Sequence, residues 1–149
     1  MITRRSTILG LSCALAAPVL ARAARPQIFT RADNIAVSGY DVTAYFSAGG
    51  PMPGEARFGT EWMGAIWHFA SAQNRETFVA SPETHAPQYG GHCAYAASKN
   101  ALASAVPQAW TIVDGKLYLN YSLGVRDRWR QDISGNIALA DGYWPALHG

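Results

Sequence analysis

The sequence predicts a small α+β domain in which two β-hairpins pack against short helices. A hairpin pattern that occurs twice carries most of this prediction. In residues 110–119, two strand-like runs flank Asp114 and Gly115, a pair suited to the tight turn of a β-hairpin. Residues 58–69 repeat the pattern around Gly64, with aromatic side chains placed to pack. Hairpin, helix, hairpin and closing helices, in that order, are typical of an α+β domain.

Helices are expected where a capping residue precedes an apolar pattern. Ser71 can cap a helix over 72–80, which ends at the Ser-Pro pair that follows it. Asp41 can cap a shorter helix before the first hairpin. Two further helices, over 122–131 and 133–140, close the chain.

The first 23 residues are typical of a cleaved export signal. Arg4 and Arg5 precede an apolar run of 13 residues from Ile8 to Leu20, and Ala23 ends a small-residue cleavage site. The run is shorter than the roughly 20 residues that a membrane-spanning helix needs. The paired arginines favour twin-arginine export, with Sec export as the alternative. We expect the export machinery as a partner and a periplasmic or secreted product that keeps no stable membrane anchor.

Cleavage after Ala23 changes the charge of the chain. Nine basic and ten acidic residues remain, so the mature protein has no basic surface for nucleic acid, and we expect no nucleic-acid partner. The remaining 126 residues suffice for one domain. We expect residues 24–36 to form a flexible arm and 37–149 to form the domain.

Cys93 is the single cysteine that remains after cleavage. In an oxidising compartment such a thiol is buried, bound to a metal or reactive. A thiolate with imidazoles suits copper or zinc, so one interpretation is a metal site of Cys93 with His92, His85 and His68. A second is that Cys93 is a small core residue. A third is a catalytic cysteine that uses His92 or His85 as its base.

Acidic and aromatic residues add candidates for a ligand-binding site that includes Cys93. Asp41 either caps its helix or turns toward the Cys93 segment as a functional carboxylate. Tyr40, Tyr89 and Tyr95 either line a small pocket or build the core, for which a small domain needs most of its aromatic side chains.

Several segments resemble secreted bacterial YHS-domain proteins and together cover nearly all of the mature chain. They are residues 38–46, 64–71, 86–91 with 93–95, and 109–121. The resemblance implies a small α+β fold. For many members it also implies a bound metal, and some are attached to copper-handling proteins.

The sequence departs from the metal-binding members of that family at two positions. Their paired cysteines correspond to Ala70 and Asn74, neither of which is a good ligand for a soft metal. We therefore expect an exported, non-catalytic module, monomeric or weakly dimeric. It would bind a small ligand or a transition metal, such as copper, zinc or iron, at a site that includes Cys93. The alternatives are a cysteine-dependent enzyme and a pure interaction domain with Cys93 in its core.

Overall fold

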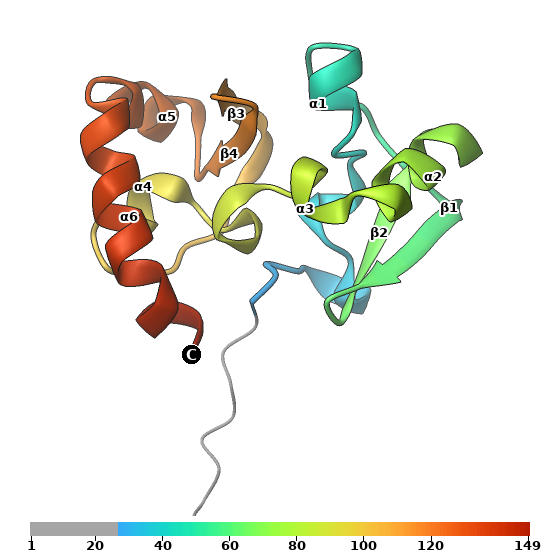
Figure 1. The fold of residues 1–149 in the computed structure, drawn as a ribbon, viewed down its shortest axis with the longest axis horizontal. Helices are drawn as coiled ribbons and strands as arrows, with labels where there is room; N and C mark the ends of the chain where they lie inside the picture. Colours follow the sequence, from blue (N-terminus) through green and yellow to red (C-terminus); the bar gives the residue numbers. More distant parts are fainter. Residues whose placement is uncertain (1–26) are drawn as a thin grey trace, which may run out of the picture.

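The computed structural model describes residues 27–149, and the expected leader over 1–23 lies outside them. The strands form two antiparallel hairpins, and helices lie beside each (Figure 1). In chain order the helices and strands are α1 (Ala44–Ser47), β1 (Glu55–Trp62), β2 (Ala65–Phe69), α2 (Ala72–Ala80), α3 (Pro82–His85), α4 (Ala94–Ala97), β3 (Val106–Val113), β4 (Lys116–Asn120), α5 (Leu123–Arg130) and α6 (Ile133–His148). The expected α+β fold is confirmed.

The first hairpin forms where the sequence predicts it. β1 and β2 pair antiparallel, and the turn residues Met63 and Gly64 have φ values of 49° and 73°. Positive φ at both central residues gives the tight turn that matches the twist of the strands. Trp67 and Phe69 are buried, whereas His68 between them is partly exposed on the other face of β2. The alternation is that of a half-buried strand.

The second hairpin has the same kind of turn. Asp114 and Gly115, with φ values of 50° and 73°, join β3 to β4. β3 begins at Val106, earlier than the expected start at Trp110, and the strand register is irregular between these two residues. The pattern over 110–119 therefore predicts the turn and the regular part of the ladder, but not the part beyond the irregularity.

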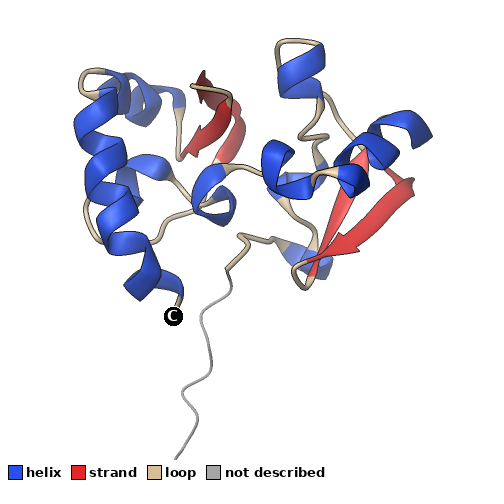
Figure 2. Ribbon diagram, in the orientation of Figure 1, coloured by secondary structure: helices blue, strands red, loops and turns tan. Residues whose placement is uncertain are grey.

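One strand, β4, contributes side chains to two clusters of buried residues. Leu117 and Leu119 belong to a cluster with β2 and α2. Tyr118 belongs to a second cluster with α4, α5 and α6. Successive side chains of a strand point to opposite faces, which lets one strand serve both clusters. Figure 2 shows the two hairpins apart from each other, each beside its own group of helices.

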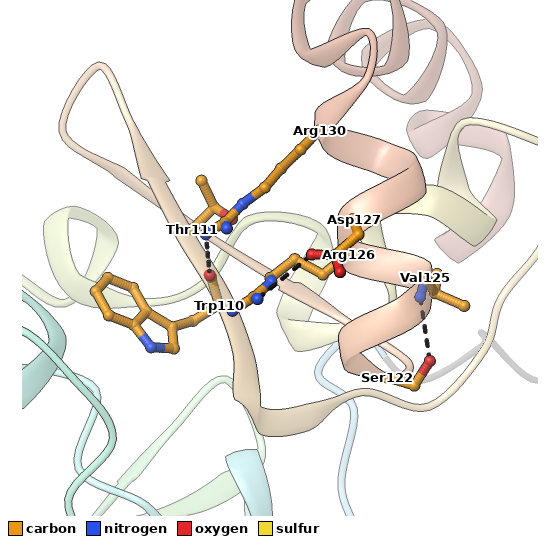
Figure 3. Close-up of polar contacts among 7 residues, drawn as sticks. All are labelled: Trp110, Thr111, Ser122, Val125, Arg126, Asp127 and Arg130. Carbon is orange, nitrogen blue, oxygen red and sulfur yellow. Dashed lines mark hydrogen bonds and ion pairs between the residues drawn. The ribbon is translucent and has the colours of Figure 1, made fainter.

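Side-chain hydrogen bonds cap α5 at its start and connect its end to the second hairpin (Figure 3). The Ser122 hydroxyl accepts a hydrogen bond of 3.2 Å from Val125 N and so caps the helix. At the other end of α5, Arg130 reaches across to β3. Its Nε donates to Thr111 Oγ1 at 2.9 Å, and its Nη2 donates to the Trp110 carbonyl at 3.1 Å.

The helices match the expected positions in part. α2 spans the expected residues, and Ser71 caps it by accepting from Asn74 N. The expectation that the last helix ends at Ala140 is wrong: α6 continues eight residues further, to His148. Leu147 is buried in the second cluster and Trp144 packs against it, so tertiary packing extends the helix through Pro145.

Two short helices were not expected. α3 and α4 have four residues each, too few for a periodic apolar pattern to show in the sequence. No helix within residues 27–149 is long and apolar enough to cross a membrane.

Residues 27–36 are held against the domain, in contrast to the flexible arm expected over 24–36. Ile28 and Ala36 are buried at 5% and 1% exposure. Phe29 N donates to the Gly90 carbonyl at 2.8 Å, and Ala36 N donates to the Ile66 carbonyl at 2.9 Å. Backbone pairing with β2 and burial of two apolar side chains explain why this segment is ordered.

Candidate functional site

Asp41, a predicted ligand-binding residue, is fully buried and accepts four hydrogen bonds. Its Oδ1 accepts from the backbone N and the hydroxyl of Thr43, at 2.9 and 2.7 Å. Its Oδ2 accepts from Ala70 N at 2.9 Å and from Asn74 Nδ2 at 2.7 Å. Four donors around two oxygens match an ionised carboxylate, which only accepts. Asp41 thereby joins the turn before α1, the end of β2 and the first turn of α2.

The expected helix cap at Asp41 is wrong in position. α1 begins at Ala44, and Thr43 occupies the N-cap position. Asp41 instead forms a turn in which its carboxylate accepts from the backbone two residues later. Ala70 and Asn74, the positions that the YHS resemblance matches to the cysteines of metal-binding members, both donate to this carboxylate.

The negative charge of Asp41 has no ion-pair partner in the part of the chain that the structure describes. The ion pairs there lie elsewhere, each with an exposed acidic group: Arg57–Glu55, Arg75–Glu76 and Arg126–Asp127. A buried charge is normally both hydrogen-bonded and paired. Asp41 has the hydrogen bonds without the opposite charge. The electric field of its carboxylate is therefore not offset by a paired cation and acts on the groups around it.

A hollow of about 360 Å³ lies between α1, α2 and α3, next to residues that hydrogen bond to this carboxylate. We call it the Asp41 hollow, and its lining residues are Thr43, Phe46, Ser47, Gln73, Asn74, Thr77 and His85. Two of them, Thr43 and Asn74, hydrogen bond directly to Asp41. The carboxylate therefore lies behind the wall of the hollow. Its volume is within the range of small-molecule sites, roughly 300 to 1,000 Å³.

The hydroxyl groups of the Asp41 hollow already donate within the protein. The Thr43 hydroxyl donates to Asp41, and the Ser47 hydroxyl donates to the Thr43 carbonyl at 3.2 Å. The Thr77 hydroxyl donates to the Gln73 carbonyl at 3.0 Å. Each hydroxyl has a single hydrogen, so these three oxygens can only accept from a ligand.

His85 adds a further acceptor and an aromatic contact. Its Nδ1 lies 3.0 Å from the Ser81 carbonyl, which can only accept, so Nδ1 carries the hydrogen. In the neutral ring Nε2 is then an acceptor. The ring also meets Phe46 edge to face, with centroids 5.4 Å apart and planes at 87°. His85 is the last residue of α3.

Cys93 is 1% exposed, and its sulfur lies among backbone amides. Its Sγ accepts from Ala96 N at 3.5 Å and from Tyr121 N at 3.3 Å. It also lies 3.6 Å from Asn120 Oδ1, to which the thiol donates. Cys93 is the N-cap residue of α4, so its thiol joins α4 to the end of β4.

Asn120 is a buried neighbour of Cys93 that the sequence does not single out. It is 0% exposed, and its Oδ1 accepts from Tyr95 N at 3.1 Å. Its Nδ2 has no hydrogen-bond partner among the described residues. Asn120 holds the start of α4 in place through both Tyr95 and Cys93.

The remaining candidate residues lie in other places. His92 packs between the rings of Phe29 and Trp144, with centroids 5.4 and 5.9 Å away. Tyr40 and His68 line a hollow of about 420 Å³, and Tyr89 lines another of about 360 Å³. Neither of these hollows, nor the Asp41 hollow, is lined by Cys93.

The predicted metal set is not assembled in this structure. Residues 27–149 contain no group of three or more His, Cys, Asp or Glu side chains that could hold a metal. His85 and His68 line different hollows, and Cys93 is buried between α4 and β4.

Burial raises the pKa of three tyrosines above the usual value near 10. For Tyr45, burial is the main cause, and its hydroxyl donates to the Pro107 carbonyl at 2.8 Å. For Tyr89, burial and then the hydrogen bond of 2.9 Å to Asp141 Oδ1 raise the pKa. For Tyr118, burial is again the first cause, followed by the negative charge of Asp141. The hydroxyls of Tyr45 and Tyr89 thus act as hydrogen-bond donors within the fold.

Comparison with known proteins returned no match: no family model, no curated protein and no solved structure is similar to this chain. The YHS resemblance therefore stays a prediction, and the site is interpreted from its own geometry.

No sequence pattern identifies most residues of the Asp41 hollow as candidate site residues. Thr43, Ser47 and Thr77 are ordinary helix-flanking or helix-surface residues until the fold brings α1 and α2 together. One feature was available: Asp41 followed two residues later by a hydroxyl side chain favours a side-chain turn. Such a turn fixes the carboxylate locally, but it gives no sign of Asn74, which is 33 residues away.

Proposed function

We propose that the protein is an exported, non-catalytic module that binds a small ligand in the Asp41 hollow. The single observation that supports this site is the buried, unpaired carboxylate of Asp41, whose hydrogen-bond partners Thr43 and Asn74 also line a hollow of about 360 Å³. Small-molecule sites combine such a hollow with a few fixed polar groups. Export is inferred from the leader pattern in the first 23 residues.

The role we propose for Cys93 is structural. Its sulfur accepts from two backbone amides and caps α4, which accounts for a thiol at this position. With 1% exposure, it has little access to a substrate. We therefore place the ligand site away from Cys93. A buried, structural thiol also favours a binding function for the protein over a cysteine-dependent reaction.

A transition metal is a weaker candidate for the Asp41 hollow. Among the lining residues, His85 alone carries a donor of the kind that copper or zinc prefers. Hydroxyl and amide groups supply the rest of the polar lining. This donor set suits an organic ligand held by hydrogen bonds better than a coordinated metal ion.

Ligand-induced thermal stabilisation tests the proposed site. Mature protein would be melted with acetate, glycerol, ethanolamine or choline as probes. At least one should raise the Tm, because a ligand that binds only the folded state stabilises it. Thr77→Trp should remove that shift, because the indole fills the hollow that Thr77 lines. Ala80→Trp, an exposed position of the same helix outside the hollow, is the matched control and should keep the shift.

Two results would overturn the proposed site. One is the absence of stabilisation by every probe in wild-type protein. The other is an equal Tm shift in wild type and Thr77→Trp, which would place the ligand elsewhere.

A further inference from the structure

We propose that the ligand of the Asp41 hollow is a small organic ammonium ion. This inference rests on the proposed function and deepens it by naming the chemical class of the ligand. Three features of the hollow support it: the charge behind its wall, the direction of its hydrogen bonds and its aromatic ring.

The charge behind the wall is negative. Asp41 is 0% exposed and accepts four hydrogen bonds, and no basic group in residues 27–149 pairs with it. Thr43 and Asn74 connect it directly to the hollow. Electrostatic interactions are stronger away from bulk water, so a cation in the hollow is attracted to this carboxylate.

Nearby surface charges leave that attraction in place. Arg75 follows Asn74 in α2, but its guanidinium pairs with Glu76 at 3.1 Å. The two charges of this pair offset each other. Glu83 on α3 is exposed and carries a negative charge of its own. The charged groups of α2 and α3 around the hollow therefore do not reverse the sign set by Asp41.

The hydrogen-bonding groups of the hollow mostly accept. The hydroxyl hydrogens of Thr43, Ser47 and Thr77 are committed within the protein. Nε2 of His85 accepts as well when the ring carries a single hydrogen, because that hydrogen is on Nδ1 and faces the Ser81 carbonyl. An ammonium group has hydrogens to donate and no lone pair, so it is complementary to these acceptors.

The donors that remain are few. Asn74 uses one amide hydrogen for Asp41 and keeps one, and the side-chain amide of Gln73 keeps both of its hydrogens. These groups suit a hydroxyl on the same ligand. An anionic ligand would be repelled by the charge of Asp41.

Phe46 supplies the third feature. Its ring lines the hollow and is held against His85 at a centroid distance of 5.4 Å. The face of an aromatic ring attracts organic cations as well as apolar groups. A hollow of about 360 Å³ has room for an ammonium group with a short organic body, such as ethanolamine or choline.

The test compares each ammonium ion with an uncharged molecule of the same shape. Ethanolamine is paired with n-propanol, and choline with its carbon analogue dimethylbutanol, in calorimetric titrations of the mature protein. We expect each ammonium ion to bind at least about tenfold more tightly than its neutral partner, because only the ion gains from the Asp41 charge. Asp41→Asn should bring this ratio close to one.

A second variant keeps the test decisive if Asp41→Asn does not fold. Phe46→Leu preserves an apolar side chain but removes the ring, and should weaken choline binding about two- to fivefold while leaving dimethylbutanol nearly unchanged. Ala80→Trp serves again as the control and should retain the wild-type ratio.

The outcomes separate this inference from the proposed function. The ammonium ions and their neutral partners could bind equally, with both losing binding in Thr77→Trp. That result would overturn the proposed ligand class but would still support the Asp41 hollow as the binding site. Binding of acetate or glycerol in the hollow in preference to both ammonium ions would do the same. Stabilisation by potassium ions equal to that by ethanolamine would also overturn it. If no probe binds in the hollow, both proposals fail.

Discussion

Asn74 Nδ2 donates a hydrogen bond of 2.7 Å to Oδ2 of Asp41, across 33 residues of sequence. The bond joins the first turn of α2 to the segment that leads into α1, and it is one of three hydrogen bonds that connect Asp41 to the lining residues Thr43 and Asn74. The hydrogen bond between Asp41 and Asn74 therefore joins two elements of the fold, and the carboxylate of Asp41 supplies the negative charge of the proposed site.

Loss of the Asp41 carboxylate should destabilise the fold strongly. Asp41→Ala leaves the buried donors of Thr43 and the partly buried backbone amide of Ala70 without an acceptor, and a buried donor without an acceptor costs about 1 to 3 kcal/mol. We expect the free energy of unfolding to fall by roughly 2 to 5 kcal/mol in chemical denaturation. Glu61→Ala, at an exposed position of β1, should change it by less than about 0.5 kcal/mol. A similar small effect at both positions would contradict the structural role of Asp41.

The thiol of Cys93 should react only in unfolded protein. The side chain is 1% exposed, so a disulfide reagent should label native protein slowly and denatured protein at once. Cys93→Ser should lower the free energy of unfolding by about 1 to 3 kcal/mol, because a shorter, more polar hydroxyl replaces the buried sulfur. Absorbance of the released reagent measures the rate. Rapid labelling of native wild type would show that Cys93 is an accessible, reactive thiol.

Stability should decrease in alkaline solution above about pH 10. Burial raises the pKa of Tyr45 and Tyr89, so the folded protein keeps protons that the unfolded chain releases near pH 10. Below that pH both states are protonated and the stabilisation is complete. Above it the free energy of unfolding falls by up to about 1.4 kcal/mol per pH unit for each tyrosine. Denaturation at a series of pH values measures the slope.

The matched variants are Tyr45→Phe and Tyr89→Phe, singly and together. Each should reduce the alkaline slope, because phenylalanine has no proton to lose. A slope unchanged in the double variant would assign the alkaline loss to other groups.

Arg130 should stabilise the contact between α5 and the second hairpin (Figure 3). Arg130→Met keeps most of the aliphatic stem but removes two hydrogen bonds, to Thr111 Oγ1 and to the Trp110 carbonyl. Because the side chain is exposed, we expect a loss of only about 1 kcal/mol. Arg128→Met, on the same helix and also exposed, is the control and should be nearly neutral. Equal losses for both variants would exclude a specific role for these two bonds.

The parts of the fold that the sequence predicts are those governed by local rules. Asp114-Gly115 forms the turn that its residue types favour, and in the first hairpin Gly64 is the turn residue that the sequence indicates, whereas Met63 also takes a positive φ that its residue type does not favour. Ser71 caps α2 through a residue three positions away. In these cases the deciding contacts lie within a few residues, so they are visible in the sequence itself.

The candidate site depends on contacts that local rules do not contain. The sequence indicates Asp41 as a candidate, but its partners Ala70 and Asn74 are brought to it by the hairpin β1–β2 and by α2. The expected grouping around Cys93 followed from residue types alone, because a single sequence does not show which histidines approach a thiol. The sequence does not predict the length of α6 for a related reason: Leu147 is buried in a cluster to which other elements contribute most of the residues.

The most direct test of the account is a nuclear magnetic resonance titration of the mature protein with ethanolamine, read at the backbone amides. We predict saturable chemical-shift changes centred on Thr43, Asn74 and Thr77, which line the Asp41 hollow, and much smaller changes with n-propanol. Changes confined to the hollows lined by His68 or Tyr89, or no saturable change at all, would contradict the proposal that the Asp41 hollow binds a small cation.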